Sequence, residues 1–117
     1  MALKRSLNHA QQTQKTQKKK TEMKEYKGFR IISFNPRWEG GRLRAIGEIK
    51  NVGETPGGPH VEVIARDENG ELVASRDFWP NSINNISPGE TRGIAHTITE
   101  DSRAKSAEIK IIGVNVW

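Results

Sequence analysis

The stretch AIGEIKNVGETPGGPHVEVIARDENGELV, residues 45–73, alternates apolar and polar side chains in the way that marks β-strands with one buried face. It covers the end of one run at residues 42–51, a second run at 60–66 and the start of a third at 71–79. Gly, Pro, Asn and Asp separate these runs and favour tight turns. We therefore expect antiparallel strands whose shared inward face is formed by Leu43, Ala45, Ile49, Val61, Val63 and Ala65.

The rest of the chain after residue 27 continues this pattern. It contains 18 Ile or Val but only two Leu, which favours strands because β-branched side chains suit a pleated surface and are stiff in helices. A change of phase near Gly113 predicts a β-bulge there. We predict an all-β, immunoglobulin-like antiparallel β-sandwich of about seven strands. The expected strands are residues 29–34, 42–51, 60–66, 71–79, 91–99 and 107–117, with a short seventh strand at 83–86.

Positive charge is concentrated before the expected sandwich. Residues 1–27 carry eight Lys or Arg and two Glu, a net charge of +6, whereas residues 28–117 carry 11 basic and 12 acidic groups, a net charge of −1. The first segment is rich in Gln, Lys and Thr, as in QQTQKTQKKKT at 11–21, and has too few apolar residues to form a core. We predict a disordered or extended basic tail at 1–27 and one sandwich domain at 28–117.

Two stretches carry a family resemblance. The stretch at 45–73, with its strand ending in GEIKN, its turn VGETP and its DENG turn, resembles the FxLYD-type and CARDB-like domains of bacterial and archaeal proteins, as does ISPGETRGIAHTI. The motif that gives the first family its name is degenerate, with only Asp67 matching. The resemblance implies an immunoglobulin-like module, commonly outside the cytoplasm or tethered to an envelope, with no catalytic residues to carry over.

The residues that usually carry chemistry form no catalytic or metal-binding pattern. The chain has no cysteine, and its three histidines, His9, His60 and His96, lack the spacing of a metal-ligand pair. We expect His96 to lie in the core or at the sheet edge, because it shares a phase with Ile94 and Ile98. No nucleophile elbow or phosphate loop is present. These observations predict a protein that is not an enzyme and that holds no metal or cofactor.

The aromatic residues are candidates for partner binding because all three Trp fall at expected strand ends or in loops. The alternative is that these rings plug the ends of the sandwich. Ile46 and Ile64 also fall on the polar faces of their strands and could pair across neighbouring strands. An apolar spot there would suggest a second sheet, a partner chain or an error in the assigned phase. The candidate partner-binding residues are Trp38, Phe78, Trp79 and Trp117, with Arg37 and Arg76 nearby.

Two functions compete at this stage. The first is a non-enzymatic interaction or structural module of a cell envelope or surface assembly, tethered by its basic tail and bound to a protein partner. The second is a nucleic-acid or virion-associated protein that holds phosphates without sequence specificity through Lys15, Lys18, Lys19, Lys20 and Lys24. The sequence contains no run of 18 apolar residues, so it predicts no membrane-spanning helix. Its first residues lack the apolar segment that a signal peptide requires. The resemblance favours a location outside the cytoplasm.

Overall fold

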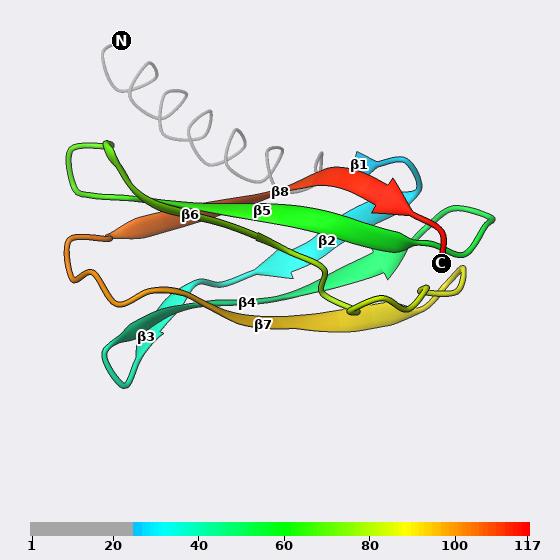
Figure 1. The fold of residues 1–117 in the computed structure, drawn as a ribbon, viewed down its shortest axis with the longest axis horizontal. Coiled ribbons are helices and arrows are strands. Elements are labelled where there is room, and N and C mark those ends of the chain that lie inside the picture. The colour runs from blue at the N-terminus through cyan, green and yellow to red at the C-terminus, as the bar shows by residue number, and fades with distance from the viewer. Residues whose placement is uncertain (1–24) are drawn as a thin grey trace, which may run out of the picture.

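A computed structural model describes residues 25–117, which form an all-β structure of two facing antiparallel sheets (Figure 1). The described residues contain no helix, and thus none that is long and apolar enough to cross a membrane. The tail lysines Lys15, Lys18, Lys19, Lys20 and Lys24 lie outside the described residues. The strands are β1 (Glu25–Tyr26), β2 (Phe29–Phe34), β3 (Arg37–Glu39), β4 (Arg42–Asn51), β5 (Gly58–Arg66), β6 (Leu72–Phe78), β7 (Thr91–Thr99) and β8 (Ser106–Asn115).

The strand order is that of an immunoglobulin-like sandwich. In the first sheet, β4 pairs on one side with β2 and β3 and on the other with β7, while β1 pairs with β2. The second sheet has the order β6-β5-β8. With β2, β4 and β7 as strands A, B and E, and β5 and β8 as C and F, the arrangement matches the two sheets of that architecture, with β6 in the position of C′.

The core lies between the two sheets and is built from the alternation that the sequence predicts. The inward face expected for β4 and β5 is buried throughout, and each buried Ile or Val contributes about 1.5 to 3 kcal/mol relative to an exposed position. The prediction of the inward face is therefore confirmed. The buried apolar residues are Phe29, Ile31, Leu43, Ala45, Ile49, Val61, Val63, Ala65, Ile86, Ile94, Ile98, Ala104, Ile109 and Ile111.

Three details differ from the expected strands. Strand β1 lies inside the segment assigned to the basic tail, because Tyr26 pairs with Phe29 and packs against the core. Strand β3 lies in an expected loop, since the Gly40 and Gly41 turn folds Trp38 back onto β4. The short strand expected at 83–86 is absent, and one isolated bridge joins Ile86 to Gly57 instead.

The expected irregularity near Gly113 is present. The pairing of β8 with β5 shifts register between Gly113 and Ile111, so Ile112 is the extra residue of a bulge. This shift brings Val114 onto the same side as Ile109 and Ile111, where it packs against the core. A single bulged residue thus reconciles the two phases of the last strand.

Candidate functional site: the aromatic end

The structure places four of the predicted partner-binding residues at opposite ends of the sandwich, while Arg76 and Phe78 lie in β6 between those ends. Trp79 and Trp117 follow β6 and β8 at the end where the chain terminates, whereas Arg37 and Trp38 lie in β3 at the other end (Figure 1). The nine residues of β5 span that separation, roughly 27 Å at the rise of an extended strand. The six candidates therefore do not form one surface.

Three rings pack together at the end that carries the C-terminus, which we call the aromatic end. The ring of His60 stacks on Trp79 with centroids 4.3 Å apart, and Trp117 meets the edge of Trp79 at 5.4 Å. The Nε2 atom of His60 lies 2.8 Å from an oxygen of Asp77 on the neighbouring strand, which holds the imidazole in place. The result is a rigid stack of rings, an arrangement that loses little conformational entropy on binding.

Trp117 is held in this stack by its backbone and by the floor beneath its ring. Its backbone N–H donates to Asn85 Oδ1 at 3.0 Å, and its carbonyl accepts from Asn85 Nδ2 at 3.4 Å. Its ring lies over Gly58, where an added Cβ would come within 2.5 Å of Trp117 Nε1. The absence of a side chain at position 58 therefore provides the space for this ring.

Exposed apolar residues occur in the segments that carry the stack. Ile83 in the β6–β7 loop and Val116 each expose 68% of their surface, and Trp117 exposes 48%. At the opposite end, Leu72 exposes 63% and Trp38 exposes 39%. Single exposed apolar residues are ordinary, whereas aromatic residues are enriched at protein interfaces, so this end is the candidate site. Sequence reasoning missed Ile83, which it placed in a strand.

Phe78 and Arg76 close the side of the sandwich between β6 and β7. The ring of Phe78 stacks on His96 with centroids 4.0 Å apart, and Arg76 Nε donates to the carbonyl of Ile98 at 3.2 Å. Burial and, to a smaller extent, the positive charges of Arg76 and Arg44 hold the pKa of His96 below its usual value of 6.5. These residues join the two sheets.

The end that carries Trp38 has a different character. Trp38 Nε1 donates to the carbonyl of Ala104 at 3.2 Å, so this ring fastens the β3–β4 hairpin to the β7–β8 loop. An open hollow of about 340 Å³ beside it is lined by Trp38, Gly41, Glu100, Ser102 and Lys105. The hydrogen bond gives Trp38 a structural role, as in the interpretation that the rings plug the ends of the sandwich.

The ionisable residues away from the aromatic end are the remaining candidates for a chemical site. Within residues 25–117, no group of three or more His, Asp or Glu side chains is placed to hold a metal ion. The most strongly shifted carboxyl is Asp101, whose pKa is lowered to about 2 by hydrogen bonds from Arg103 on the same exposed loop. That pair stabilises a turn, and Arg103 also lines an open hollow of about 310 Å³ beside Asp67 and Lys105.

No protein-family model matches the chain, and a search of curated proteins finds no match either.

Proposed function

We propose that the chain is a non-enzymatic interaction module that binds a protein partner through the aromatic end, within a cell envelope or a surface assembly. The observation that carries the proposal is the exposure of the apolar residues Ile83, Val116 and Trp117, which belong to the two segments that hold an ordered stack of aromatic rings. Large rings fixed beforehand are typical of the residues that dominate protein interfaces. The envelope setting follows the resemblance to FxLYD-type and CARDB-like domains.

The aromatic end favours a protein partner over a small ligand. Ile83 and Val116 each expose 68% of their surface, so both are accessible to the surface of another protein. The side-chain amide of Asn85 is hydrogen-bonded to the backbone of Trp117, and His60 is hydrogen-bonded to Asp77, so these two polar side chains are already paired. An apolar partner surface would therefore leave few polar groups unsatisfied on binding.

Affinity capture with the full chain tests this proposal. Ile83→Asp and Val116→Asp each place a charge at one of the exposed apolar positions, and we expect them to abolish capture of the partner from the source cells. Leu72→Asp is the matched control, because Leu72 is similarly exposed at the opposite end of the sandwich. Equal capture by all three variants would contradict the proposal, as would a saturable turnover of a defined substrate that point mutations in the sandwich abolish.

The alternative function is phosphate binding by the basic N-terminal segment. The observation that supports it is the uneven distribution of charge: residues 1–27 have a net charge of +6, and residues 28–117 have a net charge of −1. Removing residues 1–24 tests this alternative while sparing β1, whose first residue is Glu25. Nucleic-acid affinity and its salt dependence should both disappear in that variant if the segment provides the binding. Unchanged affinity would rule the alternative out.

A further inference from the structure

One long strand edge is open in the second sheet. Strand β8 pairs with β5 along its length, and among the described residues no strand pairs with its other edge. Immunoglobulin-like sandwiches place a further strand, G, beside the strand in this position. An unpaired edge presents a row of N–H and C=O groups that another strand can pair with.

The other exposed edges carry features that discourage pairing. Arg76 points from β6 toward β7 and bonds to Ile98, and the Phe78–His96 stack closes the same side. Strand β2 has β1 beside it and a register shift after Ile31. By contrast, residues 106–111 of β8 pair regularly with β5, contain no Pro and carry no charge on their inward side. Strand β1 lies beside only the C-terminal end of β8, so it does not cover these residues (Figure 1). The edge of residues 106–111 is therefore the one best prepared to receive a strand.

The sequence of this edge is complementary to itself. If two copies of β8 run antiparallel with Ile109 opposite Ile109, then Glu108 of each copy faces Lys110 of the other. The same register sets Ala107 opposite Ile111, so inward apolar side chains face each other across the junction. Opposite charges directly across an antiparallel pair stabilise it, and this register supplies two such pairs.

Neighbouring registers lose these matches. A shift that centres the pair on Glu108 sets two carboxylates opposite each other, and one centred on Lys110 sets two ammonium groups together, both of which are destabilising. A register centred between two residues would oppose an exposed charge to the buried Ile109, because opposed residues share a face. Among the registers within one residue of Ile109, the charge and burial pattern thus favours the one centred on Ile109, which also forms the most opposite-charge pairs.

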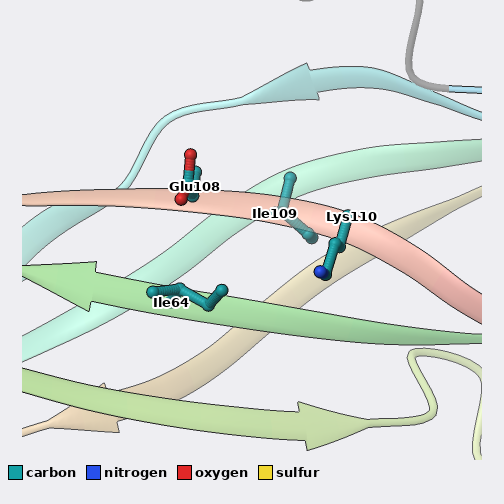
Figure 2. A pocket seen from close by; sticks show the side chains of 4 residues that line it. All are labelled: Ile64, Glu108, Ile109 and Lys110. Atoms are coloured by element: carbon teal, nitrogen blue, oxygen red, sulfur yellow. The ribbon is translucent and has the colours of Figure 1, made fainter. Parts of the chain in front are cut away.

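The charges on β5 extend the match. Lys110 Nζ lies 3.6 Å from Glu62, and Arg66 lies 3.4 Å from Glu108. In the selected register a row of alternating charges would cross the joined sheets. It would run from Arg66 and Glu108 of one copy to Lys110 and Glu62 of the other copy. Figure 2 shows Ile64 on β5 beside Glu108, Ile109 and Lys110 of β8, around a hollow of about 140 Å³ that lies between these charges.

From this pattern we infer that β8 pairs with β8 of a second copy of the chain, with Ile109 at the two-fold axis, to form one continuous six-stranded sheet. The two strands run antiparallel, so the aromatic ends of the dimer point in opposite directions. A dimer of this kind presents two separate partner-binding surfaces. The inference is independent of the proposed function, since it uses none of the residues of the aromatic end.

Sedimentation of the full chain over a range of concentrations tests the dimer. We expect the wild type to dimerise reversibly. Lys110→Glu and Glu108→Lys each set like charges opposite each other twice, and each should weaken dimerisation about tenfold or more. The double variant restores opposite charges between the two copies, but each reversed group then lies beside a like charge on β5 of its own chain. It should therefore dimerise more tightly than either single variant and less tightly than the wild type. Glu48→Lys, an equal charge reversal on the exposed face of β4, should leave dimerisation unchanged.

A second measurement needs no substitution. Hydrogen exchange of the wild type should slow with rising concentration at amides of residues 106–111, and stay constant at those of β7. A chain that remains monomeric at every concentration would overturn the inference. So would single variants that dimerise as tightly as the wild type, a double variant that fails to recover, or concentration-dependent protection located elsewhere.

Discussion

Asn51 is a fully buried polar side chain in the described core, and each of its polar atoms has a partner. Its Nδ2 donates to the carbonyls of Thr55 at 2.9 Å and Ile86 at 2.7 Å, while its Oδ1 accepts from the N–H of Gly53 at 2.9 Å. One side chain therefore connects the β4–β5 loop to the loop that carries Ile83. This connection gives the aromatic end a fixed base, because Ile86 lies three residues from Ile83.

Replacing Asn51 should destabilise the protein. Asn51→Ala removes three hydrogen bonds, including the buried one to the carbonyl of Ile86, and leaves a cavity in the core, so the free energy of unfolding should fall by about 2 to 4 kcal/mol. Urea denaturation measures this change. Asn69→Ala, in the exposed β5–β6 turn, should change stability by no more than about 0.5 kcal/mol. A loss for Asn51→Ala as small as the control would contradict the role of this network.

His96 should make stability depend on pH. Its pKa in the folded protein lies below the usual 6.5 because burial disfavours its charged form, so the unfolded chain binds the proton more tightly. The contribution of neutral His96 to the free energy of unfolding is therefore fully present above pH 6.5 and decreases as the pH falls below that value. His96→Phe keeps a ring against Phe78 and removes the titration. The difference in unfolding free energy between wild type and variant should shift against the wild type from pH 7 to pH 5; a constant difference would contradict this.

At the scale of the elements, the sequence predicts the long strands and does not predict the short ones. Alternation at β4 and β5 predicts both the strands and their buried face, because a half-buried strand must segregate its side chains. Strands β1 and β3 could not be predicted, since each is short, carries no alternation of its own and forms only by pairing with a neighbour. The segment at 83–86 has the right residues for a strand, yet turns within the β6–β7 loop leave it one bridge.

Gly47 marks the place where two elements approach too closely for any side chain. An added Cβ would lie 2.3 Å from the carbonyl oxygen of Ser33 on β2, beside the register shift of that strand. Gly47→Ala should therefore separate β2 from β4 and lower the unfolding free energy by about 2 kcal/mol or more. Gly93→Ala is the matched control, because the new Cβ on β7 would meet no atom within 4 Å. Equal thermal stability of the two variants would refute this reading of Gly47.

At the scale of the whole molecule, two N-terminal truncations test where the tail ends and the folded sandwich begins. Removal of residues 1–24 leaves every described strand intact and should leave the melting temperature within a few degrees of the full chain. Removal of residues 1–27 also deletes β1 and the contact of Tyr26 with the core, and should lower the melting temperature further. Thermal unfolding of the two truncated chains decides the matter; identical melting temperatures would show that β1 contributes nothing.

The candidate site was only partly readable from the sequence. Trp79 and Trp117 could be named as rings at strand ends, but their contact depends on strands that are adjacent through β5 and on a bulge at Ile112 that sets the direction of the last residues. The separation of Trp38 from them follows from topology. Periodicity predicts the face on which a residue lies, and it does not predict which ends of the strands meet.

The most direct test of the central claim is site-specific photo-crosslinking of the full chain in its source cells. A photoreactive phenylalanine at Val116 replaces an exposed apolar residue next to Trp117 in the chain, and the same probe at Leu72 lies at the opposite end with a similar exposure. The proposed function predicts a discrete crosslinked protein from position 116 and none from position 72. The same products from both positions, or no product from position 116, would contradict it.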